Sequence, residues 1–117
     1  MIDNALIEDI LALYDKHGWN ISRVLLSEPT RKGLGEAEIG RLFNAVAVRD
    51  SEFDGAWFVR PARNGMRALE LRHLNENPFA LFELLDDSVD EIQVREKQKE
   101  IELRMAVHAS KRRSDPA

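Results

Sequence analysis

The chain has 117 residues, which is enough for one hydrophobic core and too few for two ordinary domains. Hydrophobic residues make up 44% of it and charged residues 32%, a balance typical of a globular protein with a highly charged surface. It contains no cysteine, which excludes disulfides, thiol nucleophiles and thiolate metal sites. We therefore predict a single domain over residues 1–113, followed by a disordered tail over residues 114–117.

The net charge of −4 is unevenly distributed along the chain. Residues 1–19 hold one basic and four acidic residues (−3), and residues 20–73 hold nine and seven (+2). Residues 74–94 hold no basic and six acidic residues (−6), and residues 95–117 hold seven basic and four acidic residues (+3). This acidic belt disfavours general affinity for nucleic acid and instead predicts a basic protein partner. The belt residues that we expect to bind this partner are Glu83, Asp86 and Asp87.

The N-terminus carries acidic residues where a signal peptide needs basic ones. No apolar run approaches the roughly 20 residues that span a bilayer. We therefore expect a cytoplasmic protein that does not enter a membrane.

The first half of the chain alternates between helical and strand patterns. Helical spacing of apolar residues predicts an amphipathic N-terminal helix over residues 4–17. A β-branched apolar run predicts a strand over 20–26, followed by a short helical turn over 28–34. Helical spacing returns over 36–44 and predicts a short middle helix. Residues 45–48 either extend that helix or begin another strand.

The segment 55–74 is the strongest structural signal, because two apolar runs flank an Asn-Gly pair that favours a tight turn. A loop over residues 63–65, with Gly65 in the left-handed conformation, makes one face of the resulting hairpin apolar. In this register Trp57 pairs with Leu71 and Val59 with Leu69, and we expect all four in the core.

The last part of the chain predicts a strand and a long helix. Residues 79–86 are ambiguous between helix and strand, but a capping box over residues 88–91 begins a helix afresh and favours the strand. The final helix should run over residues 88–112, with wholly polar turns over 95–100. A stripe beyond those turns predicts self-association as a two-fold dimer: Ile101, Met105 and His108.

Together these elements predict an α+β fold. An antiparallel β-meander is built around the 55–74 hairpin, and the N-terminal helix covers the apolar face of that hairpin. A short middle helix and a long C-terminal helix complete the domain.

The order of helix, strand, short helix, helix and hairpin over residues 4–74 resembles the winged helix. In that DNA-binding fold the later helix enters the major groove and the hairpin acts as a wing. The resemblance implies nucleic-acid contacts from the later helix and the hairpin tip by Arg41, Asn44, Arg60, Arg63 and Arg67. DNA binding is therefore the alternative function.

Asp54, Glu70 and Arg72 fall on the second, mixed face of the predicted hairpin. They resemble the restriction-endonuclease-like family, which uses an aspartate and a Glu-x-Lys on adjoining strands to hold magnesium. Here arginine replaces the lysine, and arginine does not readily accept a proton. A metal-dependent nuclease is thus the third hypothesis.

The three histidines, His17, His73 and His108, lack the spacing of a metal site. We predict no catalytic residue, no metal and no cofactor. The leading functional prediction is a non-catalytic protein-interaction domain.

Overall fold

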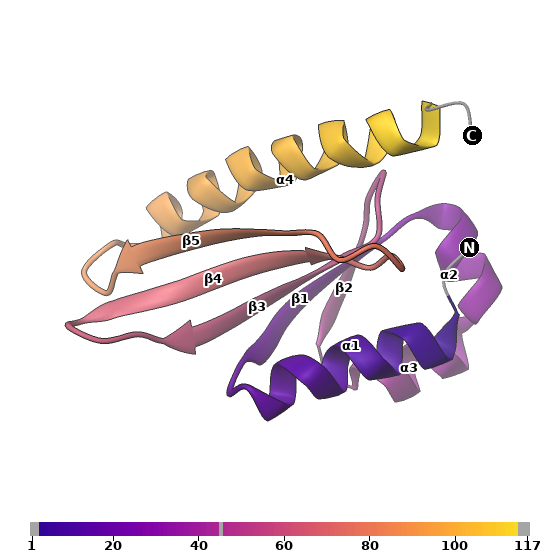
Figure 1. Cartoon of the computed structure of the whole chain (residues 1–117), viewed down its shortest axis with the longest axis horizontal. Helices are drawn as coiled ribbons and strands as arrows, with labels where there is room; N and C mark the ends of the chain where they lie inside the picture. The colour runs from indigo at the N-terminus through magenta and orange to yellow at the C-terminus, as the bar shows by residue number, and fades with distance from the viewer. Residues whose placement is uncertain (1–2, 45, 115–117) are drawn as a thin grey trace.

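The computed structural model describes residues 3–44 and 46–114, with side chains as far as residue 111. In this part of the chain, a five-stranded sheet has the order β2-β1-β3-β4-β5, and helices lie on both of its faces (Figure 1). The elements follow one another as α1 (Asn4–Lys16), β1 (Asn20–Leu26), α2 (Glu28–Leu34), α3 (Glu36–Phe43), β2 (Ala47–Asp50), β3 (Gly55–Pro61), β4 (Met66–His73), β5 (Ala80–Asp86) and α4 (Glu91–Ser114).

The α+β class is confirmed, but the sheet is not a purely antiparallel meander. β2 pairs with β1 in parallel, whereas β1–β3, β3–β4 and β4–β5 are antiparallel. Parallel neighbours need a crossover connection, and α2 and α3 supply it between β1 and β2. The sequence left residues 45–48 open between helix and strand: residue 45 lies outside the described residues, α3 ends at Phe43, and Ala47 and Val48 begin β2.

The hairpin has the predicted register. Trp57 lies opposite Leu71 and Val59 opposite Leu69. Gly65 has a φ of 70°, and the loop closes with a hydrogen bond from the Ala62 N–H to the Met66 carbonyl (2.9 Å). Local turn chemistry therefore fixes this pairing.

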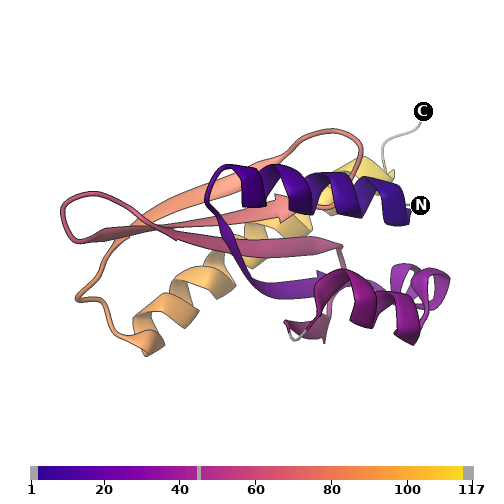
Figure 2. The same cartoon turned by 90° about the horizontal axis from the view of Figure 1, so that it is seen from below.

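One face of the sheet is covered by α1 and α3, as Figure 2 shows from below. The Tyr14 ring of α1 stacks on Phe58 of β3, with ring centroids 3.9 Å apart. The prediction that the N-terminal helix covers the Trp57 face is therefore wrong, because Phe58 points to the opposite face. That face is apolar enough to need a helix of its own, since its buried residues include Val24, Leu26, Ala56, Phe58 and Leu74.

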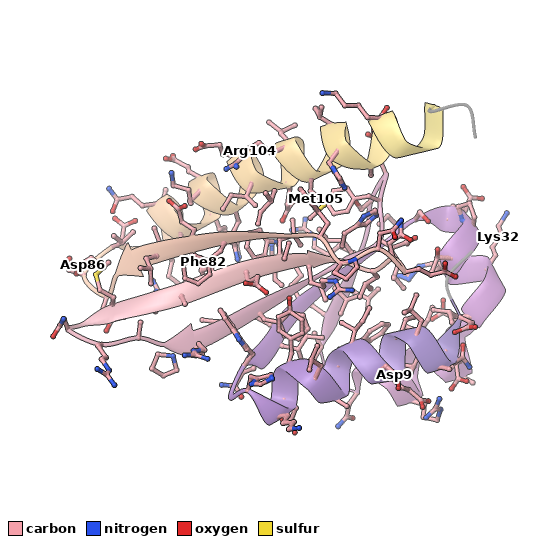
Figure 3. The ribbon with its side chains drawn as sticks, in the orientation of Figure 1. Asp9, Lys32, Phe82, Asp86, Arg104 and Met105 are labelled. Carbon is pink, nitrogen blue, oxygen red and sulfur yellow. The ribbon has the colours of Figure 1, made fainter. Side chains whose placement is uncertain are left out.

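α4 covers the Trp57 face. Its residues Ile101, Met105 and Ala109 are buried against Trp57 and Leu71 of the sheet. Figure 3 shows Met105 between α4 and the strands. This corrects the expectation that Ile101 and Met105 project towards a second subunit, because α4 folds back to cover an apolar sheet face.

The ends of α4 also differ from expectation. The helix begins at Glu91, because the Asp90 carboxylate accepts the Gln93 N–H (2.8 Å) and Gln93 accepts the Asp90 N–H (3.4 Å). The capping box therefore lies two residues later than predicted, since Ser88 is held in the preceding turn by Asp86. α4 continues to Ser114, and residues 115–117 of the predicted tail lie outside the described residues.

The predicted strand over 79–86 is confirmed by β5. None of the helices in the described part of the chain combines the length and the apolar character that a membrane crossing requires.

Candidate functional site

The residues implied by the winged-helix resemblance divide between two parts of the molecule. On α3, Arg41 forms an ion pair with Glu8 of α1 (2.5 Å) and a hydrogen-bonded pair with Glu38. The hydrogen bond to Arg41 lowers the pKa of Glu38, and the same bond raises the pKa of Arg41. Asn44 ends α3 with a φ of 44°. Arg41 thus joins two helices.

The other three arginines lie along the hairpin. Arg60 lies over the Trp19 ring, 5.2 Å from its centroid, and donates to the His17 carbonyl (3.0 Å). Arg67 donates to the Val89 carbonyl (3.4 Å), and Arg63 is exposed in the turn. Figures 1 and 2 place this turn and α3 at opposite ends of the sheet. The structure thus groups Arg41 with Asn44 at α3, groups the other three along the hairpin, and separates the hairpin turn from α3.

The residues of the nuclease hypothesis contact structural partners. The Asp54 carboxylate accepts the Ser27 N–H (2.7 Å) and the Thr30 hydroxyl (2.7 Å), which fixes the start of α2. Glu70 accepts a hydrogen bond from the Tyr14 hydroxyl, and burial together with this bond raises the pKa of Tyr14. Arg72 donates to the carbonyl of the next residue (2.9 Å). Within the described ranges, no three histidine or carboxylate side chains are grouped as metal ligands.

The predicted acidic belt also divides. Glu83 points to the α4 side, where it pairs with Lys97 (3.5 Å). Asp86 accepts the Ser88 N–H (2.8 Å), and this bond lowers its pKa. Asp86 and Asp87 are exposed at the end of β5. The structure thus leaves two of the three acids available at the end of one strand.

β5 is the outermost strand of the sheet, and both of its faces are apolar. Leu81 and Leu85 pack on the α4 core. On the other face Phe82 is 52% exposed and Leu84 48% exposed, and Figure 3 shows Phe82 and Asp86 along this strand. We call Phe82 and Leu84 the β5 strip.

The β5 strip is exposed because α1 ends before reaching it. After α1 the chain turns at Gly18, and Trp19 meets Phe82 edge to face, with centroids 6.4 Å apart. Arg60 lies over the same Trp19 ring. Trp19 therefore forms the boundary of the covered surface, and the β5 strip lies beyond it.

The free edge of β5 also presents backbone groups. The His73 N–H donates to the Phe79 carbonyl (2.9 Å), and the Asp87 N–H donates to the Gly65 carbonyl (2.8 Å). Hydrogen-bonded pairs alternate along an antiparallel ladder, and the register between these two bonds is unbroken. Odd-numbered residues of β5 therefore bond to β4. The N–H and C=O groups that point to the free edge belong to Ala80, Phe82 and Leu84, whereas the Asp86 carbonyl accepts the Val89 N–H (3.0 Å).

Sequence reasoning found this strand but missed its exposed apolar face. The available signal was the sequence ALFELLD, in which apolar residues occupy both faces of a strand next to an acidic turn. In the described part of the chain, one face has a helix to cover it and the β5 strip does not. The chain matches no protein-family model, and no curated protein and no solved structure matches it significantly.

Proposed function

We propose that the protein is a non-catalytic interaction domain that binds an extended segment of a partner protein as a sixth strand on β5. The observation that carries this proposal is the coincidence of the β5 strip with a free strand edge. Strand edges of this kind bind peptides by β-augmentation, in which backbone hydrogen bonds give affinity and alternate side chains give specificity. We place this activity in the cytoplasm, as the sequence predicts.

The chemistry of the strand indicates the chemistry of the partner. Apolar side chains at alternate positions of the bound segment would pack on the β5 strip. Lysine or arginine near one end would lie close to the exposed Asp86 and Asp87. The proposed partner is therefore the basic protein that the charge distribution predicts.

A second copy of this chain suits the edge less well. If two β5 strands paired about a two-fold axis at Glu83, the Glu83 carboxylates of the two copies would lie opposite each other. Like charges in that position destabilise a strand pair. Ile101 and Met105 are buried against the sheet, so these two residues do not form an exposed dimer surface on α4. Self-association is therefore an alternative outcome of the experiment below.

The test is a selection of random displayed peptides against the whole chain. We expect the selected peptides to alternate apolar residues and to carry lysine or arginine. Leu84→Pro, which removes an outward N–H, should weaken their binding by about tenfold or more. Leu84→Ala should weaken it less, because the N–H remains.

The matched control is Leu103→Ala, which removes a 70% exposed leucine from α4. It should leave peptide binding unchanged. Peptides that bind Leu84→Pro as tightly as the unaltered chain would overturn the proposed edge. A dimer abolished by Leu84→Pro would assign the edge to a second copy.

A further inference from the structure

A second surface lies on the α4 side of the sheet, near its other edge. An open cleft of about 360 Å³ separates the β1–β2 pair from the first half of α4. Basic side chains line it from both sides, and we call these four residues the basic cleft: Arg23 and Arg49 on the strands, Arg95 and Lys99 on α4.

The two walls of the basic cleft follow from the strand register and the helix period. Arg23 lies opposite Trp57, whose ring packs towards α4, so Arg23 faces the same way. Arg49 pairs with Leu25 in the parallel ladder, and Leu25 also packs in the α4 core. Arg95 and Lys99 are four residues apart, one helical turn, and therefore lie on one side of α4.

The two acidic residues of the cleft contact other groups and do not pair with these cations. Asp50 pairs with Arg31 outside the cleft (3.4 Å), and Glu102 accepts the Trp57 indole N–H (2.7 Å). Between residues described in the structure, none of the four cations makes a hydrogen bond or an ion pair. Four basic and two acidic side chains leave the lining at +2, in a chain whose net charge is −4.

The two basic segments of the chain meet at this cleft. Residues 20–73 and 95–117 are both positive and are separated in sequence by the acidic belt. The fold brings one pair of cations from each segment to the same cleft. Because like charges repel each other, this arrangement is more favourable when an anion lies between them.

We infer that the basic cleft binds a small molecule that carries a diphosphate group. Arginine presents a planar fork that matches phosphate oxygens in pairs, and three arginines with one lysine on two walls suit more than one phosphate. The volume of the cleft lies in the range of small-molecule sites.

The surroundings add an organic portion to this ligand. A shallow hollow of about 450 Å³ lies next to the cleft and shares Ser51, Lys99 and Glu102 with it. Its lining also includes Phe53, Leu103 and Ala106. An apolar or ring-shaped group attached to the diphosphate would pack there. The class that combines both features is a nucleoside diphosphate.

The experiment is isothermal titration of the whole chain with ADP and with inorganic pyrophosphate at low salt. We expect one saturable site, tighter for ADP, whose affinity falls as salt increases. Arg49→Gln and Arg95→Gln should each weaken binding by about tenfold, because each removes a charge-assisted contact. Both residues are exposed, and circular dichroism should show that both variants keep the fold.

Arg104→Gln is the matched control, since it removes an exposed arginine from the same helix outside the cleft and changes the net charge equally. It should bind ADP as the unaltered chain does.

No saturable binding of either ligand, or an equal loss in Arg104→Gln, would overturn the site. Equal affinity for ADP and pyrophosphate would overturn the role of the apolar hollow. A single-stranded oligonucleotide that binds more tightly than ADP and loses affinity in Arg49→Gln would overturn the small-molecule assignment.

Discussion

The two edges of the sheet present opposite chemistry, although α4 contributes to both. At the β5 edge, exposed apolar side chains adjoin Asp86 and Asp87, and α4 supplies Lys97 to Glu83. At the β2 edge, α4 forms one wall of the basic cleft. Five strands about 4.8 Å apart span roughly 19 Å, whereas a helix is about 10 Å wide. One helix therefore cannot cover a whole sheet face: α4 leaves the basic cleft open at the β2 edge, and on the opposite face α1 leaves the β5 strip exposed.

The part of the sheet that α4 covers gives the largest expected effect. Met105→Ala should lower the free energy of unfolding by about 2–5 kcal/mol, because the Met105 side chain is fully buried between α4 and the sheet. Leu103→Ala, on the exposed side of the same helix, should change it by less than about 0.5 kcal/mol. Urea unfolding measures both. Equal effects would show that α4 does not rest on the sheet as described.

A pair of proline substitutions in β5 tests the open edge itself. Leu85→Pro removes an N–H that bonds to β4 and leaves a ladder carbonyl without its donor, so it should cost at least about 1–3 kcal/mol. Leu84→Pro removes an outward N–H and should cost less than about 1 kcal/mol, since edge strands tolerate proline there. The reverse order in urea unfolding would mean that the alternation along β5 is shifted by one residue.

The sequence predicted what local chemistry determines. The Asn64-Gly65 turn fixes the hairpin register, and the apolar runs fix most element boundaries. It could not assign helices to sheet faces, because the Phe58 face of the hairpin is mixed by itself and becomes an apolar surface only where β1 adds Val24 and Leu26. The parallel pairing of β1 with β2 depends on how α2 and α3 pack, which no local pattern encodes.

The binding surfaces were hidden for a related reason. The basic cleft joins Arg49 to Arg95, which lie far apart in sequence and on opposite sides of the acidic belt. Each cation alone has the pattern of an ordinary surface residue. The position of Glu83 within the acidic belt predicts contact with a partner, whereas β-strand alternation turns its side chain towards Lys97.

The smallest expected effect concerns the acidic end of the β5 edge. The Ser88 N–H holds the pKa of Asp86 below its usual value. A lowered folded-state pKa means that this contact stabilises the fold above the unfolded-state pKa of about 3.8, and that the contribution is lost as the pH falls through the folded-state value. Asp86→Asn keeps an acceptor oxygen but removes the charge. The difference in melting temperature between the two proteins should therefore be constant above about pH 5 and shrink below about pH 4. Asp87→Asn makes the same change in net charge one residue further on, without the Ser88 contact. If the two variants gave the same pH dependence, the effect would come from net charge and not from the turn that ends β5.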